Sequence, residues 1–338
     1  SGARRLRTKP KRMPDNKAVQ AALEELNEKY GEGSIMKMSD DKRPTDIEFW
    51  PTGCMSLDYV FGCGGVPRGR VIEVFGAPSS GKSSASLYLA AQVQKAGGTV
   101  VWIDAEFCYG KKYAAEMGVV TDDLILCQPS SAEQAFDTMD AMAKANVDLI
   151  VVDSVAALVP QKEVEGDASQ ETIGLLARIM SKGLRKLTST LGKSKTTVIF
   201  INQVRDTIQT FGYGPKKTTP GGNALRFYAS VRLEVKKIKT LKAKEEVVGS
   251  TIVIEAVKNK VAPPFRSIEV DFLFGKGFDL DGELLRLGEK HGLIKRNGIS
   301  YSYGEAKLAA GADKAAAVLA ADDKMRDSLK KKLVEFMV

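Results

Sequence analysis

The chain of 338 residues carries 50 Lys and Arg residues against 42 Asp and Glu residues, and 43% of it is hydrophobic. This apolar content supports a large core, and the lack of an apolar run of about 18 residues argues against a membrane span or a signal peptide. Four cysteines without a C-x-x-C pair and a single histidine, His291, argue against a zinc site or a histidine-based triad. We therefore expect a cytoplasmic protein with reduced cysteines, whose formal net charge of +8 suits a polyanionic partner.

The N-terminal residues predict a basic arm followed by a small helical unit. Six basic residues and no acidic residue fall within the first twelve, so residues 1–14 are expected to be a disordered arm. Asp15 then caps a segment that ends at Gly31-Glu32-Gly33 and is followed by a short apolar run. Its apolar stripe consists of Ala18, Val19, Ala22, Leu23 and Leu26. A unit of this size cannot bury the stripe alone, so residues 15–45 are expected to dock on their own core or on a neighbouring subunit.

From residue 46 to 278 the sequence alternates apolar strands with helices. Strands without period-two alternation are typical of a parallel sheet covered on both faces, which predicts an α/β core. The expected strands are residues 71–75, 99–105, 124–127, 148–152 and 197–202, and the expected helices are residues 82–96, 111–117, 132–145 and 172–191. Three later segments alternate more and are expected to extend the sheet as antiparallel strands, at residues 230–238, 249–258 and 267–274.

Residues 279–338 are expected to form a small appended α+β domain. The pair Asn297-Gly298 between short apolar segments is typical of a β-hairpin turn. One helix is expected before the hairpin and two after it, at residues 281–291, 312–321 and 323–336. Two other segments are expected to be long and irregular, at residues 160–171 and 205–222.

A phosphate-binding loop is the strongest motif in the sequence. An apolar strand runs directly into the pattern G-x-x-x-x-G-K-S, which ends at Ser83 and opens the next helix. Gly76 and Gly81 allow backbone N–H groups to face phosphates, Lys82 can reach the β and γ oxygens, and the Ser83 hydroxyl can ligate Mg²⁺. The motif therefore predicts nucleoside triphosphate binding by Gly76, Ala77, Pro78, Ser79, Ser80, Gly81, Lys82, Ser83 and Ser84.

Three more strands end in polar side chains, at the sheet edge where α/β proteins bind ligands. Asp153 ends one strand and is placed to order Mg²⁺ through its water shell. Glu106 follows another strand and can accept the proton of a water that attacks the γ-phosphate, with Asp104 as the competitor for that role. Gln203 ends the third and carries an amide that can sense the γ-phosphate at the root of a mobile loop.

The segment after Gln203 has the composition of a nucleic-acid-binding loop. Its basic, aromatic and glycine residues suit phosphate neutralisation and base stacking on a single strand, and an ordinary surface loop is the alternative. The residues concerned are Arg205, Phe211, Tyr213, Lys216, Lys217, Gly221, Gly222 and Asn223. The guanine-reading pattern N-K-x-D is incomplete because Ala262 occupies the acidic position, so GTP specificity is not predicted.

Taken together, these motifs make the chain resemble the bacterial RecA recombinases, from about Asn16 to the C-terminal domain. The resemblance implies a RecA-type P-loop ATPase core at 46–278 with a mixed, mainly parallel sheet, a polymerisation helix in residues 15–45, and duplex-DNA binding by residues 279–338. It implies an ATP-dependent helical filament on single-stranded DNA that pairs it with homologous duplex DNA in recombinational repair and the SOS response to DNA damage. The motifs that carry the resemblance are Gly76–Ser83, Asp104-Ala105-Glu106, Val151–Leu158, Phe200–Gln203, Gly221–Arg232 and Val257–Lys260.

For the ATPase site, the resemblance implies ATP and Mg²⁺ as cofactors. It assigns Lys82 and Ser83 to phosphate and metal binding, and Asp153 to the metal shell. It assigns Glu106 to water activation and Gln203 to γ-phosphate sensing.

For the subunit and DNA contacts, the resemblance implies that Tyr113 stacks on adenine. Lys258 and Lys260 would reach the nucleotide held by the adjacent subunit. Residues 164–173 and 205–222 would be the two DNA-binding loops. The DNA-facing side chains in and beside these loops would be Ile173, Arg178, Ser181, Arg185 and Ile208.

The sequence departs from the family pattern around the site. Residues 107–111 replace the usual His-Ala-Leu-Asp-Pro, which affects the polar contact on the adenine side. In the second DNA loop the basic residue expected near Thr207 is absent and Asp206 stands beside that position, and the loop is one residue longer and contains Pro220. DNA affinity is therefore expected to depend more on Lys216 and Lys217.

The sequence leaves two alternative functions open and predicts two further properties of the binding partners. A ring helicase of the same ATPase superfamily is one alternative, although an N-terminal helix and two irregular loops favour a filament. An ATP-gated DNA-coating scaffold with little hydrolysis is the other. The basic ending at Lys330, Lys331 and Lys332, in place of the family's acidic tail, predicts duplex DNA binding with little extra Mg²⁺. A self-cleaving repressor is a further expected partner.

Overall fold

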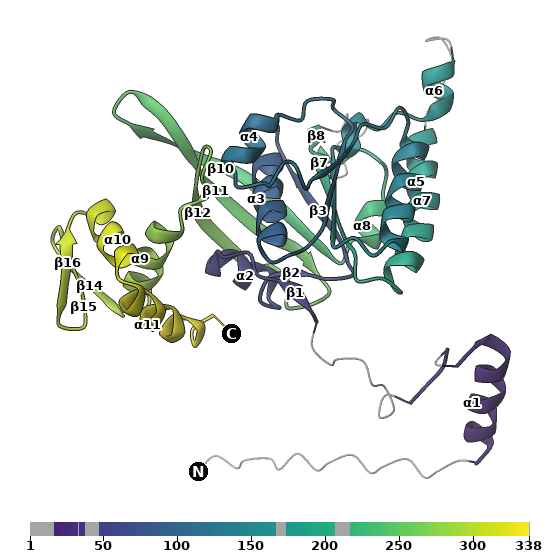
Figure 1. Cartoon of the computed structure of the whole chain (residues 1–338), viewed down its shortest axis with the longest axis horizontal. Coiled ribbons are helices and arrows are strands. Elements are labelled where there is room, and N and C mark those ends of the chain that lie inside the picture. Colours follow the sequence, from purple (N-terminus) through teal and green to yellow (C-terminus); the bar gives the residue numbers. More distant parts are fainter. Residues whose placement is uncertain (1–16, 33, 38–46, 167–173, 207–216, 338) are drawn as a thin grey trace, which may run out of the picture. The chain divides into compact units, whose positions relative to one another are not determined.

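The computed structural model describes residues 17–32, 34–37, 47–166, 174–206 and 217–337. Two units are distinguished, residues 1–46 and residues 47–338 (Figure 1). In the first unit α1 (Lys17–Tyr30) confirms the expected helix, and none of its side chains that the structure describes is buried. The backbone of Gly31 (φ +99°) adopts the left-handed conformation that ends the helix. The basic arm and Asp15 lie outside the described residues.

The second unit is built on a nine-stranded sheet with the order β13-β12-β11-β10-β3-β7-β6-β4-β5. The strands β3, β7, β6, β4 and β5 are mutually parallel, which confirms the expected parallel core. Their bounds and those of the remaining strands are β3 (Val71–Gly76), β4 (Val100–Asp104), β5 (Ile125–Cys127), β6 (Leu149–Asp153), β7 (Thr197–Gln203), β10 (Val231–Ala243), β11 (Glu246–Asn259), β12 (Ser267–Leu273) and β13 (Gly277–Phe278).

The expectation that all three later strands are antiparallel is wrong for β10. This strand pairs with β3 in parallel, with Val231 opposite Ile72, and only β11, β12 and β13 continue the sheet in antiparallel fashion. The connection between β7 and β10 is long and contains α8 (Ala224–Tyr228). A connection of this length allows the chain to return and enter the sheet in the same direction as β3, whereas a short turn would give an antiparallel strand.

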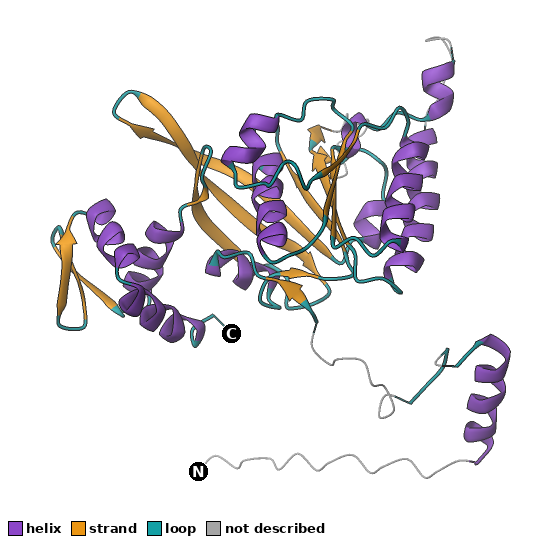
Figure 2. Cartoon of the chain, in the orientation of Figure 1, coloured by secondary structure: helices purple, strands orange, loops and turns teal. Residues whose placement is uncertain are grey.

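Helices cover both faces of the sheet, as Figure 2 shows for the purple ribbons on either side of the orange strands. Successive residues of β4 illustrate why: Trp102 faces one apolar cluster and Ile103 faces the other. The first cluster contains side chains of α2 (Met55–Phe61), α3 (Lys82–Lys95) and α4 (Lys111–Glu116), and the second contains side chains of α5 (Ala132–Lys144), α7 (Leu175–Leu191) and α8 (Ala224–Tyr228). Each face of the sheet is therefore buried, which explains the unbroken apolar runs of the strands.

Several short elements were not expected from the sequence. The segment 160–171, expected to be irregular, contains α6 (Gln161–Glu165), and the segment 205–222 contains the paired strands β8 (Arg205–Asp206) and β9 (Lys217–Thr218). The others are β1 (Phe49–Trp50), β2 (Val66–Pro67), the 3₁₀ turn η1 (Val155–Ala157), and the helices α2 and α8. Elements of two to seven residues are too short to show a hydrophobic period.

Residues beyond β13 have a small apolar core of their own, formed by helices packed on a three-stranded sheet. The hairpin at Asn297-Gly298 is confirmed, because β14 (Ile294–Asn297) pairs with β15 (Ser300–Tyr303). The third strand β16 (Ala306–Ala310) was missed, since its alanines carry little strand preference. The helices are α9 (Leu280–Lys290), α10 (Ala312–Ala321) and α11 (Asp323–Val334). Across the described residues, no helix is long and apolar enough to cross a membrane.

Candidate active site

The phosphate loop joins β3 to α3 and is held in a tight conformation. Gly81, which precedes α3, has φ +96°, a value that favours glycine. At Gly76 an added Cβ would lie 2.2 Å from the carbonyl oxygen of Val235 in β10, so a side chain does not fit there. The start of α3 has no side-chain cap, and the buried Ser80 hydroxyl lacks a hydrogen-bond partner among the described residues. Unpaired donors around a helix N-terminus fit a phosphate group.

Lys82 folds back onto this loop. Its Nζ donates to the carbonyl oxygen of Ala77 at 2.7 Å, and the residue is 7% exposed. Burial lowers the pKa of Lys82, while the negative charges of Asp153 and Glu106 act in the opposite direction. A cation held in this position would gain from a phosphate, because the added negative charge offsets the cost of burial.

The structure brings Ser83 and Asp153 together, as the sequence predicted. Asp153 ends β6, and burial raises its pKa to about 6, against a hydrogen bond from the Ser83 hydroxyl that lowers it. A hydroxyl beside a carboxylate that burial makes hard to charge fits a hard cation with oxygen ligands, which Mg²⁺ completes with water and substrate phosphate. The described residues contain no group of three or more His, Cys, Asp or Glu side chains able to hold a metal by themselves.

Glu106 and Gln203, which the sequence also singled out, lie in direct contact. Gln203 Nε2 donates to Glu106 Oε1 at 3.2 Å, and Ser154 Oγ donates to the same oxygen at 2.7 Å. The thiol of Cys108 lies 3.8 Å from Glu106 Oε2. Ser154 was missed by the sequence reasoning, although its position directly after Asp153 was a usable signal. We define Lys82, Glu106, Asp153, Ser154 and Gln203 as the strand-end site.

Asp104, the competitor for the base role, is engaged elsewhere. It is 1% exposed and accepts hydrogen bonds from the backbone N–H groups of Cys108 at 3.1 Å and Tyr109 at 3.0 Å, and from Gln128 Nε2 at 2.9 Å. Both of its oxygens are therefore used to anchor the turn after β4. Glu106 is exposed and is free to meet a water molecule, so the geometry favours Glu106 as the base.

The other predicted nucleotide contacts occupy separate positions. Tyr113 in α4 donates to Ser84 Oγ at 2.9 Å, which sets its ring beside the start of α3. Lys258 Nζ donates to the carbonyl oxygens of Arg226 at 2.6 Å and Phe227 at 3.0 Å near the end of α8. Burial lowers the pKa of Lys258, and the positive charge of Lys260 adds to this effect.

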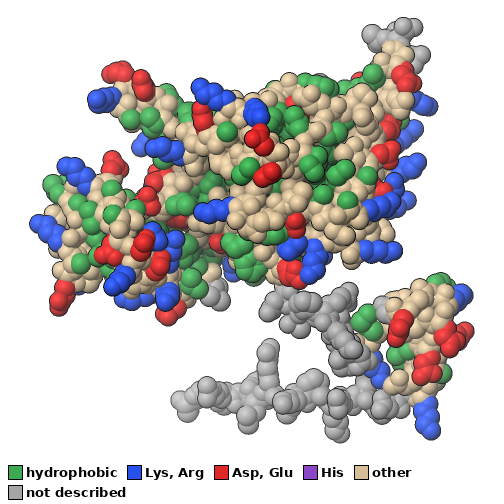
Figure 3. Space-filling view, in the orientation of Figure 1, with side chains coloured by type: hydrophobic (Ala, Val, Ile, Leu, Met, Phe, Trp, Pro, Cys, Tyr) green, Lys and Arg blue, Asp and Glu red, His purple; other side chains and the backbone are tan. Residues whose placement is uncertain are grey.

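The candidate DNA-facing residues that the structure describes gather around α7. Arg178, Ser181 and Arg185 follow one another at spacings of three and four on this helix, so they share a face. Basic side chains gather along this edge of the molecule, together with acidic ones (Figure 3). At Gly222 an added Cβ would lie 2.9 Å from the Cβ of Ala177, so the segment that leads into α8 lies against α7.

The backbone of the second candidate DNA loop closes at its base. In β8 and β9, Arg205 is opposite Thr218 and Asp206 is opposite Lys217. Gly221 and Gly222 both have positive φ values, and Asn223 precedes α8 without a side-chain cap. Ile173, Ile208 and Lys216 lie outside the described residues.

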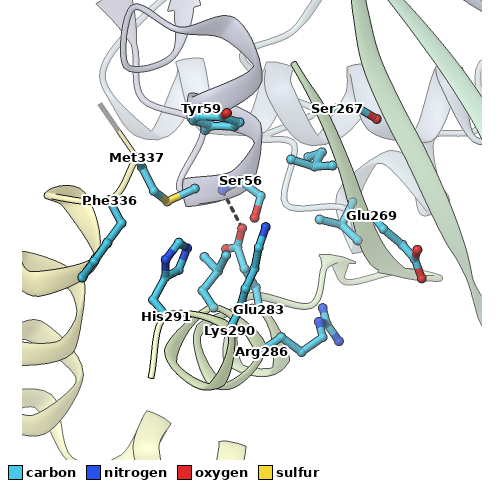
Figure 4. A pocket seen from close by; sticks show the side chains of 13 residues that line it. Ser56, Tyr59, Ser267, Glu269, Glu283, Arg286, Lys290, His291, Phe336 and Met337 are labelled. Carbon is cyan, nitrogen blue, oxygen red and sulfur yellow. Dashed lines mark hydrogen bonds between the residues drawn. The ribbon is translucent and has the colours of Figure 1, made fainter. Parts of the chain in front are cut away.

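A separate cavity of about 370 Å³ lies between α2, β12 and α9 (Figure 4). Its buried Glu283 accepts hydrogen bonds from the backbone N–H groups of Ser56 at 2.7 Å and Met55 at 3.2 Å, and from Cys54 Sγ at 3.1 Å. None of the residues predicted to act in catalysis or in single-stranded DNA binding lines this cavity. We call the contact of Cys54, Met55 and Ser56 with Glu283 the α2–α9 junction.

The fold and the site define a P-loop nucleotide hydrolase. They combine a phosphate loop, the strand-end carboxylate of Asp153 beside Ser83, and a parallel sheet core covered on both faces. The RecA N-terminal domain model matches residues 17–279, and the RecA C-terminal domain model matches residues 282–337. The chain belongs to the RecA family.

Similar proteins support this membership over nearly the whole chain. Protein RecA of Oleidesulfovibrio alaskensis is 46% identical over 321 residues, which cover 95% of this chain and 91% of that protein. Protein RecA of Campylobacter jejuni is 47% identical over 328 residues, which cover 96% and 95%. The crystal structure of the RadB recombinase matches with a TM-score of 0.51 at 22% identity, covers 68% of this chain and 98% of that one, and shows a shared fold.

Membership of this family makes the chain a DNA-dependent ATPase of DNA recombination and repair, which binds ATP and DNA and forms filaments. The helicase ring and the weakly hydrolysing scaffold are not favoured by these comparisons.

Proposed function

We propose that this protein binds ATP with Mg²⁺ at the phosphate loop, assembles into a helical filament on single-stranded DNA, and catalyses pairing with homologous duplex DNA. The contact of Glu106 with Gln203 and Ser154 carries the proposal, because it joins a candidate base and a candidate phosphate sensor at the start of the DNA loop. The cytoplasm is the proposed location.

In the proposed mechanism each side chain of the strand-end site has one task. Ser83 would ligate Mg²⁺ and Asp153 would order its water shell, and the bound ion would neutralise charge on the phosphates. Lys82 would stabilise the charge that develops on the γ-phosphate. Glu106 would take the proton of the attacking water, while Ser154 and Gln203 hold its carboxylate in place.

The proposed partners follow from the remaining surfaces. Arg178 and Arg185, which are exposed, and Ser181 would contact the phosphates of single-stranded DNA, and residues 279–338 would contact duplex DNA. The apolar stripe of α1, in which Leu23 and Leu26 are half-buried and the other side chains are exposed, would dock on a neighbouring subunit to extend the filament, because no side chain of that helix is buried within the described residues. Lys258 and Lys260 would act on the nucleotide of that neighbour, and a self-cleaving repressor is a further proposed partner.

Phosphate release from ATP, measured with and without single-stranded DNA, tests the proposal. The parent protein is expected to release phosphate faster when DNA is added and to form filaments visible by electron microscopy. Lys82→Ala is the control, since it removes the cation of the loop and is expected to abolish release under both conditions. Rings in place of filaments would support a helicase, and filaments without DNA-stimulated release would support a coating scaffold.

A further inference from the structure

A fully buried carboxylate lies beside the phosphate loop and takes no part in the proposed chemistry. Glu73 is in β3, three residues before Gly76, and its side chain is 0% exposed. A buried charge is costly unless it is paired and hydrogen-bonded. Both oxygens of Glu73 are used: Oε2 accepts from Arg232 Nε in β10, and Oε1 accepts from Asn202 Nδ2 in β7 at 3.0 Å. Glu73 therefore joins β3 to the strands on both of its sides.

The side-chain amide of Asn202 extends this link to two backbone groups. Its Nδ2 also donates to the carbonyl oxygen of Pro220 at 3.2 Å, and its Oδ1 accepts from the N–H of Gln203 at 2.9 Å. The carboxylate of Glu73 and the carbonyl oxygen of Pro220 can only accept hydrogen bonds, and the N–H of Gln203 can only donate, so these three partners together determine which end of the amide is Nδ2. Asn202 is 0% exposed, and water cannot substitute for these partners. Glu73 is the side chain among these three partners, and it holds the amide in the place where its donor faces Pro220 and its acceptor faces Gln203.

These two backbone groups lie just before and near the end of the second candidate DNA loop, residues 205–222, which we call the DNA segment. Gln203 precedes the segment, and its side chain donates to Glu106. Pro220 stands where the chain returns, immediately before Gly221-Gly222, which lies against α7. A displacement of the returning chain would move the Asn202 amide, and the amide would move the backbone of Gln203 and its contact with Glu106.

On the other side of β3, the partner of Glu73 is Arg232, which lies close to Lys258, the lysine proposed to reach the nucleotide of a neighbouring subunit. Arg232 lies opposite Lys258 in the pairing of β10 with β11, and its guanidinium stacks 4.5 Å from the ring centroid of Phe75. Lys258 holds the last turn of α8 through the carbonyl oxygens of Arg226 and Phe227. Because α8 follows the DNA segment directly, that segment is held at its start by Asn202 and beyond its end by Lys258.

We propose that Glu73 is a positioning residue that couples the DNA segment at Pro220 to ATP hydrolysis at Glu106 by holding the Asn202 amide against its partners at Pro220 and Gln203. This inference rests on the proposed function, because it explains how DNA stimulates the same site. The hydrogen-bond partners of Glu73, Asn202 and Arg232, lie outside the phosphate loop to which ATP would bind. Its loss would therefore reduce stimulation by DNA and leave ATP affinity unchanged.

Glu73→Gln tests this role, because the NH₂ group of the new amide would face a donor, either Asn202 Nδ2 or Arg232 Nε, so that the charge and one of the two buried hydrogen bonds are lost. The ratio of phosphate release with and without single-stranded DNA is expected to fall about tenfold, as the loss of an oriented buried hydrogen bond would produce. The affinity for a fluorescent ATP analogue is expected to stay at the parent value. Glu283→Gln is the matched control: it also neutralises a buried carboxylate, makes no contact with Asn202, and is expected to keep the parent ratio.

Asn202→Ala provides a second variant if Glu73→Gln does not fold. It leaves the Glu73–Arg232 pair intact, removes the bonds to Pro220 and Gln203, and is expected to lose the same stimulation. A folded Glu73→Gln or Asn202→Ala protein with the parent ratio would overturn the inference, and so would an equal loss in Glu283→Gln. A parent protein that DNA does not stimulate would instead overturn the proposed function, and the inference with it.

Discussion

The strand-end site and the α2–α9 junction each contain a carboxylate with three hydrogen-bond donors, but the donors differ. Around Glu106 the donors are side chains, namely the Ser154 hydroxyl, the Gln203 amide and the more distant Cys108 thiol, and the carboxylate is exposed. Around Glu283, which is 4% exposed, two of the three donors are backbone N–H groups in the first turn of α2.

This difference separates a carboxylate suited to chemistry from one suited to structure. Side-chain donors can rotate away when a water or a phosphate arrives, so Glu106 can change partners during a reaction. Backbone donors at a helix start are fixed, and a buried carboxylate that accepts from them acts as a cap and as a link between elements. Replacing Glu106 with an amide should therefore change ATP hydrolysis, and replacing Glu283 with an amide should change the stability of the fold.

The largest effect is expected from Glu106→Gln. The amide keeps the size and can still accept from Ser154, but it cannot take the proton of water, so phosphate release should fall about 10²–10⁴-fold. ATP and DNA binding should persist, and the free energy of unfolding should change by less than about 0.5 kcal/mol because the side chain is exposed. Phosphate release and chemical denaturation measure the two properties. Normal turnover would move the base role to another group such as Asp104.

Glu283→Gln should show the reverse pattern. Its amide NH₂ would face a backbone donor of α2, which leaves a buried group unpaired and should lower the free energy of unfolding by about 1–3 kcal/mol. Phosphate release below the unfolding transition should match the parent protein. Glu289→Gln, in the same helix but partly exposed, is the matched control and should be close to neutral. Lost hydrolysis in folded Glu283→Gln would mean that the junction and the strand-end site are not independent.

Sequence patterns identified Ser83 and all of the strand-end site except Ser154, because these residues are local to strand ends. Glu106, Asp153 and Gln203 each follow an apolar run, Lys82 and Ser83 end the loop after another, and parallel strands bring such positions to one edge. The sequence could not decide whether Glu106 or Asp104 is the catalytic base. That choice depends on which carboxylate accepts the backbone hydrogen bonds of the turn at Cys108 and Tyr109.

The links between strands were beyond the sequence for a related reason. Glu73 and Asn202 meet only because β3 lies beside β7 in one particular register, and this register is a property of the whole sheet. The parallel direction of β10 and the junction at Glu283 likewise depend on contacts distant in the chain. Local periodicity carries no information about such pairs.

A third prediction extends the comparison to the loop that follows the strand-end site. If Lys216 and Lys217 bind DNA phosphates, then replacing both with Ala should reduce the slope of log affinity against log salt by about 0.7 for each phosphate of single-stranded DNA that is no longer neutralised. Titrations at several salt concentrations measure the slope. Replacing the exposed Lys95 and Lys144, at the ends of α3 and α5, is the matched control and should leave it unchanged. An unaltered slope in the loop variant would remove both lysines from the DNA interface.

The smallest effect concerns Asp58, which belongs to the junction side of the comparison. Its Oδ1 accepts from the N–H and the hydroxyl of Thr52, yet burial raises its pKa to about 6, and the negative charge of Glu283 acts in the same direction. The folded protein therefore binds this proton more tightly than the unfolded chain, whose Asp has a pKa of about 3.9. Between these two values a fall in pH stabilises the fold, by at most about 1.4 kcal/mol per pH unit.

Denaturation of the parent protein and of Asp58→Asn between pH 7 and pH 4 measures this contribution. As the pH falls through about 6, the free energy of unfolding of the parent should increase relative to that of the variant, because residue 58 of the variant cannot bind a proton. In the Glu283→Gln background this gain should shrink, since one cause of the raised pKa is gone. The exposed Asp123→Asn should show no such gain. If the free energies of unfolding of the parent and of Asp58→Asn changed with pH in the same way, Asp58 would not be the group whose protonation stabilises the fold.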